Sequence, residues 1–341
     1  MHDPLKAIVA RATGLSPTAI DISPRAPIGY QANRLYDAWV DRRHLIVKEF
    51  LLPAEQQVAP AREFEALTLL APLDIAPQPV FYEPSLGPVV IYEFMEGEMW
   101  DRRRPAPADL AQLAGTWLKI NAVKSDILWL SNGHDRPLQA IAATLRAHLQ
   151  AYADWADAEF TPGRRAAELC LGALDSRGDL VSELAGEVPV LCFCRADPRF
   201  ANVIQRPGGR LGLIDWEDSG LRDPARDLAD IMLHPNQEDF LSPDDWQPFL
   251  KPYLASRSLL DARLMHRAHL YMALFPIFWL TVIMNQGRGL AGASRWKGWS
   301  INGLPPNVRL RRYLARALAW PEANFKRELE NLGDTAFFPG S

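Results

Sequence analysis

The sequence is poor in cysteine and has no excess of basic residues. Only three cysteines occur in 341 residues, and Cys192 and Cys194 form a C-x-C pair inside an apolar run. A small, odd number argues against a disulfide framework, and on a strand these two side chains share a face and pack as apolar groups. Acidic residues outnumber basic ones, 41 to 37, for a formal net charge of −4. Because binding a nucleic-acid backbone requires clustered positive charge, we expect no nucleic-acid partner.

The sequence predicts neither a secretion signal nor a membrane-spanning helix. Its first residues, Met1 to Lys6, do not have the basic-then-apolar order of a signal peptide. The most apolar run, Leu270 to Met284, is too short to cross a bilayer comfortably and contains Pro276. We therefore expect a buried helix there, no membrane association and a cytoplasmic protein.

The N-terminal part of the chain is rich in strand signals. Two short apolar runs, 38–40 and 45–47, flank a polar cluster, which predicts a β-hairpin. A helix is predicted from Pro60 to Pro72, where apolar residues recur at helical spacing behind an N-terminal proline. Two more strands are predicted at 79–82 and 89–92, separated by a turn-prone segment.

The rest of the chain is predominantly helical in pattern. From Pro107 onward apolar residues recur every three or four positions, except in Val188 to Asp215, where two short apolar runs flank a Pro-Gly-Gly turn. The sequence therefore predicts an α+β protein of two lobes. Residues 1–96 form a small β-rich lobe, and residues 97–341 form a large, mostly α-helical lobe.

The segment around the Pro-Gly-Gly turn carries the strongest chemical signal. If the turn closes a hairpin in which Leu211 pairs with one of the two residues before the turn, Asn202 lies opposite or diagonal to Asp215. A carboxylate and an amide oxygen held together suit Mg²⁺, which takes one or two protein oxygens and leaves the rest to water and phosphate. Asp197 lies on the loop just before, where a base for an incoming hydroxyl would stand.

Several motifs in this region occur in the order found in a known family. The spacing D-x-x-x-x-N followed by a metal-binding Asp is that of the kinase catalytic loop. Residues 195–202, I-D-W-E at 214–217 and D-P-A-R-D-L-A at 223–229 together resemble the aminoglycoside phosphotransferases and choline kinase-like enzymes. The resemblance implies a protein kinase-like fold and transfer of the γ-phosphoryl group of ATP, with Mg²⁺, to a hydroxyl of a small metabolite or antibiotic. Asp197 would then be the catalytic base, and Asn202 and Asp215 the metal ligands.

The resemblance extends into the predicted β-rich lobe. The segment 29–36 resembles the phosphate-covering loop of the family, with Gly29 and Asn33 as nucleotide-binding residues. Lys48 resembles the strand lysine that binds the α- and β-phosphates. Glu63 on the following helix resembles its ion-pair partner, with Glu65 as a rival for that role. A buried lysine needs such a partner to stay charged.

Two further sets of residues are expected to contact the ligands. Residues 92–97 resemble the connection between lobes, where backbone groups of Glu93 and Met95 would read the adenine edge. Glu217 and Asp218 follow the metal-binding aspartate and could attract a cationic acceptor, or could be solvated loop acids. An aromatic cage for a quaternary ammonium is a further alternative, although tryptophans serve more often in packing. Its walls would be Trp216, Trp279, Trp296 and Trp299.

One departure from the family pattern concerns the residues before the catalytic aspartate. Arg195 and Ala196 stand where the family usually has His and Gly. An arginine could brace the loop differently or approach the phosphates, which leaves a kinase-fold binding protein without transfer activity as the alternative function. Asp223 and Asp227 are predicted to be structural. The identity of the acceptor, the choice between ATP and GTP, and the oligomeric state stay open.

Overall fold

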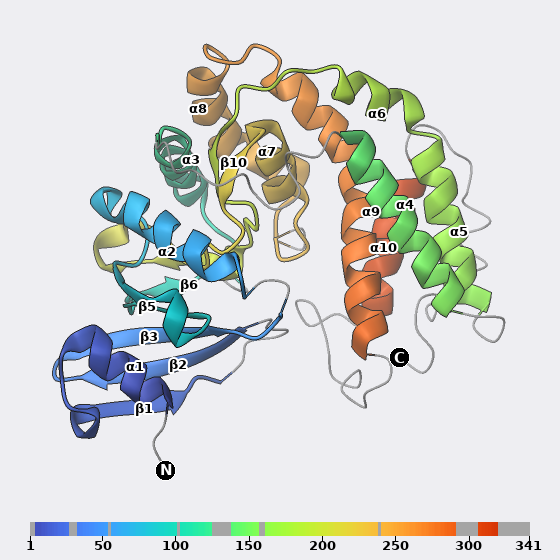
Figure 1. Cartoon of the computed structure of the whole chain (residues 1–341). Helices are drawn as coiled ribbons and strands as arrows, with labels where there is room; N and C mark the ends of the chain where they lie inside the picture. The colour runs from blue at the N-terminus through green and yellow to red at the C-terminus, as the bar shows by residue number, and fades with distance from the viewer. Residues whose placement is uncertain are drawn as a thin grey trace. The chain divides into compact units, whose positions relative to one another are not determined.

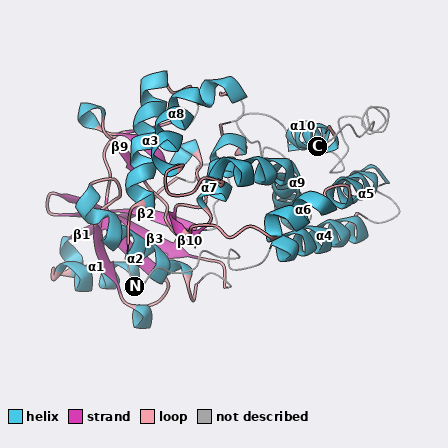
Figure 2. Ribbon diagram, turned by 90° about the horizontal axis from the view of Figure 1, so that it is seen from above, coloured by secondary structure: helices cyan, strands magenta, loops and turns pink. Residues whose placement is uncertain are grey.

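The structure is a computed structural model that describes most of the chain. The described residues are 4–26, 33–53, 56–100, 103–124, 138–156, 161–237, 240–290 and 306–319. Strands concentrate in the first hundred residues and helices in the rest, which agrees with the predicted α+β division. Figure 2 distinguishes the helices from the strands by colour.

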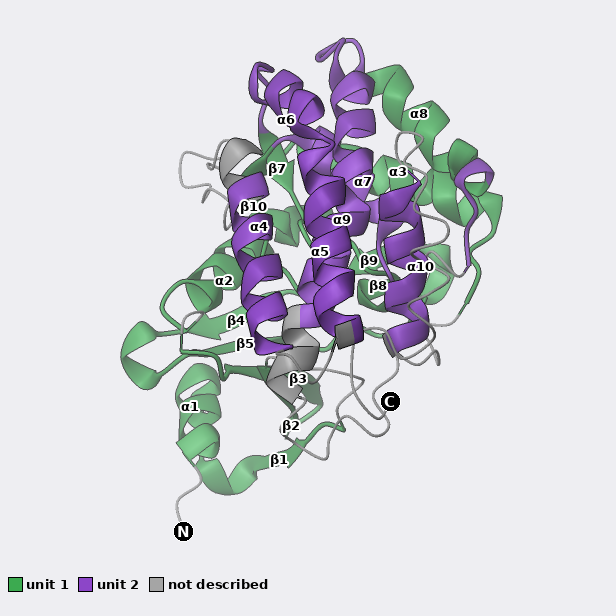
Figure 3. Cartoon of the chain, turned by 90° about the vertical axis from the view of Figure 1, so that its right-hand side faces the viewer, with its two compact units in different colours: residues 1–132, 192–222, 245–256 green, residues 133–191, 223–244, 257–341 purple. Residues whose placement is uncertain are grey.

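Two compact units pack internally (Figure 3). One comprises residues 1–132, 192–222 and 245–256, and the other residues 133–191, 223–244 and 257–341. These units differ from the predicted lobes 1–96 and 97–341, which stay a prediction.

The first unit contains a five-stranded antiparallel sheet in the order β1-β2-β3-β5-β4 (Figure 1). Its strands are β1 (Ile20–Pro24), β2 (Asn33–Val40), β3 (Arg43–Phe50), β4 (Pro79–Tyr82) and β5 (Val89–Glu93). The predicted hairpin joins β2 and β3. Its turn is shorter than the polar cluster suggested, because Arg43 already pairs with Val40. Asp41 lies in the turn with φ 55°, a left-handed conformation that aspartate tolerates better than most residues.

Two helices pack on this sheet. The first, α1 (Pro4–Thr13), has Leu5, Ile8 and Val9 on one face, and they join a core that includes Leu45 and Val47 of β3. This helix was not predicted. The second, α2 (Ala59–Leu70), begins near Pro60 as predicted and packs on β4 and β5.

The rest of the first unit consists of short strands and two helices. A three-stranded sheet has the order β6-β8-β9, and β7 pairs antiparallel with β10. Gly97 lies close to β8 of the three-stranded sheet. Its φ is +145°, and a Cβ there would lie 2.4 Å from the backbone oxygen of Gln205. Only glycine fits this position. The elements are β6 (Glu98–Met99), α3 (Pro107–Asn121), β7 (Cys192–Cys194), β8 (Val203–Gln205), β9 (Leu211–Leu213), β10 (Gly220–Arg222) and α8 (Gln247–Arg257).

The described part of the second unit is helical. Helix α7 packs on α9, α4 on α5, and α10 on α9. Arg177 is fully buried and donates hydrogen bonds to backbone oxygens of Ala173, Ala273 and Ala317, so one side chain ties α5, α9 and α10 together. The helices are α4 (Leu138–Trp155), α5 (Thr161–Asp175), α6 (Gly178–Ala185), α7 (Pro224–Leu233), α9 (Leu264–Leu290) and α10 (Pro306–Leu318).

A buried ion-pair network fixes the start of α7. The Asp223 carboxylate accepts a hydrogen bond from the backbone N–H of Ala225, 2.9 Å away, and so caps the helix as predicted. Arg267 of α9 binds Asp223 at 2.9 Å and Asp261 at 2.5 Å. All three charged side chains are buried. The network supports the structural role predicted for Asp223.

Helix α9 contains the apolar run noted in the sequence. Within the described residues, Leu264–Met284 is the one segment long and apolar enough to cross a membrane by length and composition. However, 72% of its most apolar window is buried. This burial agrees with the predicted core helix.

Candidate active site

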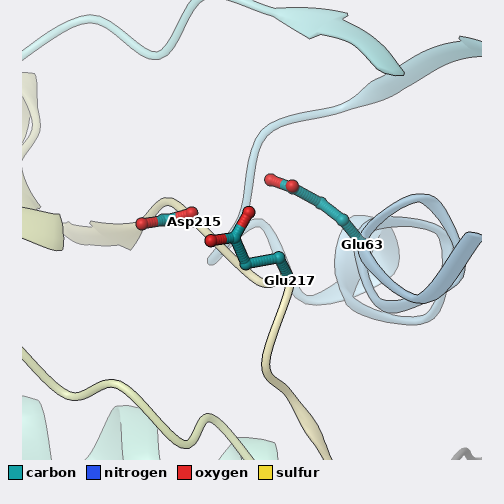
Figure 4. A group of neighbouring side chains, drawn as sticks. All are labelled: Glu63, Asp215 and Glu217. Atoms are coloured by element: carbon teal, nitrogen blue, oxygen red, sulfur yellow. The ribbon is translucent and has the colours of Figure 1, made fainter. Parts of the chain in front are cut away.

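Lys48 of β3 stands at the centre of a cluster of three carboxylates. Its Nζ lies 2.6 Å from Glu63 Oε2 of α2, 2.6 Å from Asp215 Oδ1 and 2.9 Å from Glu217 Oε2. Figure 4 shows the three carboxylates turned toward one another. The predicted ion pair of Lys48 is therefore formed with Glu63, and not with its rival Glu65. We call Lys48, Glu63, Asp215 and Glu217 the carboxylate cluster.

Burial and charge set the protonation of this cluster. Burial alone would lower the pKa of Lys48, but the carboxylates of Asp215, Glu217 and Glu63 outweigh it and hold that pKa well above its ordinary value. Burial raises the pKa of Glu63, against the opposing charge of Lys48. Burial likewise raises the pKa of Glu217 to about 8, with Lys48 opposing and the neighbouring carboxylates adding to the shift. One ammonium thus faces more carboxylate than it can neutralise.

The carboxylate cluster has the donor chemistry of a divalent-cation site. One carboxylate oxygen from each of Glu63, Asp215 and Glu217 lies within 4.8 Å of the other two. Oxygen donors that converge in this way suit Mg²⁺, which is a hard cation and keeps part of its shell for water and phosphate. Of these carboxylates Asp215 is a predicted metal ligand, and its oxygens fit the predicted Mg²⁺, while Glu63 and Glu217 pair with Lys48.

The hairpin formed by β8 and β9 brings Asn202 to Asp215. Gln205 pairs with Leu211, which is one of the two predicted registers. In this register the Ile214 N–H donates to the Asn202 backbone oxygen at 3.0 Å, and Asp215 lies diagonal to Asn202. The Asn202 Nδ2 donates to Asp215 Oδ2 at 3.3 Å. Both predicted metal ligands therefore meet at the open end of the hairpin.

Asn33, the first residue of β2, reaches the same place. Its Nδ2 donates to Glu217 Oε2 at 2.5 Å. Glu217 therefore contacts both Lys48 and the end of the predicted phosphate-covering loop, whereas a cationic acceptor or solvent was expected to face it. Gly29, the other residue predicted in that loop, lies outside the described residues.

Arg195 braces the loop that carries Asp197. The arginine is 1% exposed, and its Nε donates to the Asp197 backbone oxygen at 3.1 Å. Its Nη2 donates to the backbone oxygens of Ile214 and Asp215, the latter at 3.2 Å. The guanidinium also lies 5.0 Å from the ring centroid of Trp216. Of the two roles considered for Arg195, the structure supports bracing, since its donors bind backbone carbonyls on both sides of the site.

The backbone conformation at Ala196, the residue after Arg195, explains why glycine is usual at this position in the family. Ala196 has φ 70°, in the left-handed region. Glycine adopts this conformation freely, whereas a side chain costs roughly 1–2 kcal/mol. The alanine therefore introduces backbone strain next to Asp197.

The predicted connection between lobes leaves the backbone N–H of Met95 available. The Glu93 N–H donates to Gln78 at 2.9 Å, and the Glu93 side chain binds Arg43 at 2.6 Å. The Met95 N–H donates to no backbone carbonyl within the described part of the chain. The Met95 side chain lies over Gly212, where a Cβ would come within 2.1 Å of its sulfur.

Two other residues considered for acceptor binding, Asp218 and Trp216, have contacts within the protein. Asp218 faces Arg62: burial lowers the pKa of Arg62, and the charge of Asp218 opposes that shift. Trp216 is fully buried and stacks on Phe193 with ring centroids 6.1 Å apart. Trp216 is therefore a core residue and cannot form a wall of the considered aromatic cage. Trp296 and Trp299 fall outside the described residues.

Sequence reasoning missed one charged residue of this loop, Arg199. It occupies a variable position of the D-x-x-x-x-N spacing, so the motif gave it no role. Burial alone would raise the pKa of Asp215, but the charge and hydrogen bond of Lys48 overcome it, aided by Arg199 and Arg195, and the value falls to about 2. The signal that could have identified Arg199 is a positive residue two positions after the predicted base.

Comparison with known proteins agrees with this geometry. The model of the phosphotransferase enzyme family matches residues 25–271. A choline kinase from Streptococcus pneumoniae superimposes with a TM-score of 0.60 at 18% identity, covering 93% of this chain and 100% of that one. A choline/ethanolamine kinase family protein from Mesorhizobium loti gives 0.62 at 18% identity, covering 96% and 97%. Spectinomycin phosphotransferase in complex with ADP and spectinomycin gives 0.58 at 13%, covering 87% and 92%.

These structural similarities confirm the predicted two-lobed kinase-like fold. No curated protein sequence matches this chain significantly.

Proposed function

The chain belongs to the phosphotransferase enzyme family, and we propose that it transfers the γ-phosphoryl group of ATP to a hydroxyl of a small molecule in the cytoplasm. The observation that carries this proposal is the convergence of Lys48, paired with Glu63, and of Asn202 on the carboxylate of Asp215. A positive charge for phosphates and oxygen ligands for a cation lie together there, and phosphoryl transfer needs both.

Each residue of the site has a proposed role. Asp197 orients the acceptor hydroxyl and takes its proton, while Asn202 and Asp215 hold Mg²⁺. Bound Mg²⁺ would neutralise charge on the phosphates. Lys48 binds the α- and β-phosphates, and the segment from Gly29 to Asn33 covers them. These roles amount to positioning and electrostatic stabilisation, with no covalent enzyme intermediate.

Nucleotide recognition and acceptor choice are assigned separately. Backbone groups of Glu93 and Met95 would bind the adenine edge, and the free N–H of Met95 supports this. Glu217 and Asp218 were predicted to face the acceptor, but the contacts of Glu217 with Lys48 and Asn33 favour a place beside the phosphates. Choline-like amino alcohols, sugars, homoserine and aminoglycosides are the acceptor classes to test. We propose the predicted lobes 1–96 and 97–341 as the nucleotide-binding and acceptor-binding parts.

The test is an acceptor screen with the Asp197→Asn variant. Wild-type protein is incubated with radiolabelled ATP, Mg²⁺ and each acceptor class, and labelled product is measured. We expect Asp197→Asn to abolish transfer but to bind ATP as wild type does in calorimetry, since the nucleotide contacts lie elsewhere. Asp21→Asn, an exposed position on β1, is the matched control and should keep full activity.

Two outcomes would contradict the proposal. Turnover by Asp197→Asn would show that Asp197 is not the base. Nucleotide binding without transfer to any acceptor would favour the alternative, a kinase-fold binding protein. The reason for considering that alternative was Arg195, and its bracing contacts weaken that reason.

A further inference from the structure

A cavity of about 540 Å³ lies beside the predicted connection between lobes, within the first compact unit. Its walls come from the turn between β2 and β3, the segment that leads into β4, the connection itself and the turn between β8 and β9. The residues that line it include no member of the carboxylate cluster, and neither Asp197 nor Asn202. The cavity is therefore distinct from the candidate active site, and its volume is typical of a small-molecule pocket.

One wall of the cavity is a stack of three aromatic rings. Trp39 and His44 pair directly across β2 and β3, so their side chains share one face of the sheet, and their ring centroids lie 4.0 Å apart. Phe94 of the connection stacks on His44 at 4.1 Å. His44 is held in place by Asp37, whose Oδ1 lies 2.7 Å from its Nε2. Trp39 ends the stack, is 48% exposed and makes no further ring contact within the described part of the chain. Its outer face is open to another flat ring.

The charged groups around the cavity leave a positive excess. Asp74 serves two guanidinium groups at once, since it binds Arg206 at 2.8 Å and also Arg210. Arg42, in the turn between β2 and β3, is exposed and has no hydrogen bond or ion pair to any described residue. Guanidinium groups bind phosphates and carboxylates through parallel hydrogen bonds, so spare donors suit an anion. In total the lining has four arginines against three carboxylates, namely Arg42, Arg43, Arg206 and Arg210 against Asp74, Glu93 and Glu96.

We propose that this cavity binds a flat aromatic ligand that carries a phosphate or a carboxylate. The ring stacks on the outer face of Trp39, and the anionic group accepts hydrogen bonds from Arg42 and from the spare donors of Arg206 and Arg210. Both parts of the ligand are needed, because the stack offers no charge and the arginines offer no apolar surface of comparable size. The site goes beyond the proposed function, since no step of the transfer uses it.

Calorimetry with naphthalene probes tests the proposal. Naphthyl phosphate and naphthoate carry the two anionic groups on the same ring, naphthol is the neutral comparison, and inorganic phosphate lacks the ring. The full chain is titrated in saturating Mg²⁺ and ADP, so that the candidate active site is occupied. We expect at least one anionic probe to bind, and naphthol and inorganic phosphate to bind it about tenfold more weakly or less. The tighter of the two anionic probes identifies the preferred anionic group.

Substitutions at the cavity locate the bound probe. Arg42→Gln should weaken its binding about tenfold, because charge-assisted hydrogen bonds are lost. Trp39→Ser should weaken it about fivefold through loss of stacking, whereas Trp39→Phe keeps a ring and should recover most of the affinity. The matched control is Arg164→Gln on α5 of the other unit, where an exposed guanidinium binds Glu168. This control should bind the probe as the wild type does.

Three results would overturn the proposal. They are failure of both anionic probes to bind, equally tight binding of naphthol, and binding that neither Arg42→Gln nor Trp39→Ser weakens. Each would leave the proposed function standing, because the substituted residues lie outside the candidate active site. If the protein does not bind ADP, the proposed function fails, but the same variants still locate the probe. Arg42→Gln should unfold within about 2 °C of wild type, because no described partner is lost.

Discussion

Replacing Arg195 by methionine tests whether this residue is the brace of the catalytic loop. The change keeps the length and apolar stem of the side chain, but removes donors to the backbone oxygens of Asp197, Ile214 and Asp215. A hydrogen bond from a charged donor contributes about 1.5–3 kcal/mol, and each stranded carbonyl adds a penalty. Such losses are not additive within one network. Breaking comparable buried charged contacts costs about 3–5 kcal/mol, and we expect a loss of that size for Arg195→Met.

Urea unfolding followed by tryptophan fluorescence measures this loss. Trp216 stacks with Arg195 and Phe193, so its emission reports on the braced region. The matched control is Arg199→Met, the same substitution four residues away at a side chain without partners. The control should shift the free energy of unfolding by less than about 1 kcal/mol. A loss below 1 kcal/mol for Arg195→Met, or equal losses for both variants, would refute the brace.

Three other predictions concern the carboxylate cluster and the loop. Glu63→Gln removes an ion-pair partner of Lys48, so the affinity for Mg²⁺-nucleotide measured by calorimetry should fall about tenfold. Glu65→Gln, the control on the same helix, should bind the nucleotide as the wild type does. Equal effects of the two substitutions would contradict the pairing of Lys48 with Glu63. The pKa of Glu217 is raised from 4.5 to about 8, so its ionisation costs more in the folded protein than in the unfolded one. Without metal, the free energy of unfolding of Glu217→Gln should therefore rise relative to that of the wild type as pH increases from about 4.5 to about 8. Urea titrations at several pH values measure this difference. If it did not change with pH, burial would not perturb the pKa of Glu217. Ala196→Gly should relieve left-handed strain and raise the free energy of unfolding by roughly 1 kcal/mol, whereas a decrease would show that the loop depends on the alanine side chain.

The sequence was most informative where a short-range rule fixes the geometry. The polar cluster after Val40 predicted the β2–β3 hairpin, and the Pro-Gly-Gly turn limited the register between β8 and β9 to two possibilities. Both follow from local turn chemistry. The α1 helix was missed, because its ten residues carry only three buried apolar side chains and owe their helical state to the sheet beneath them.

At the site, the sequence predicted the metal-binding residues better than it predicted the contacts that depend on the folded chain. Motif spacing brought Asn202 and Asp215 together and offered Glu63 as the partner of Lys48. It could not place Glu217 against Lys48, since that contact depends on the distance between a strand and a loop 169 positions apart (217 − 48). It also directed attention to Arg195 because that residue departs from a pattern. The unpartnered state of Arg199 depends on the folded surroundings alone.

The buried thiols give each compact unit an internal reporter of opening. Cys170 lies in α5 of the second unit, while Cys192 and Cys194 lie in β7 of the first, directly before Arg195. All three are buried thiols outside any disulfide, and burial raises the pKa of Cys170 to about 12, which keeps it as the unreactive thiol. Alkylation in the native state therefore requires local opening. Peptide-resolved labelling rates would measure the opening free energy of the strand that leads into the catalytic loop separately from that of the helical unit.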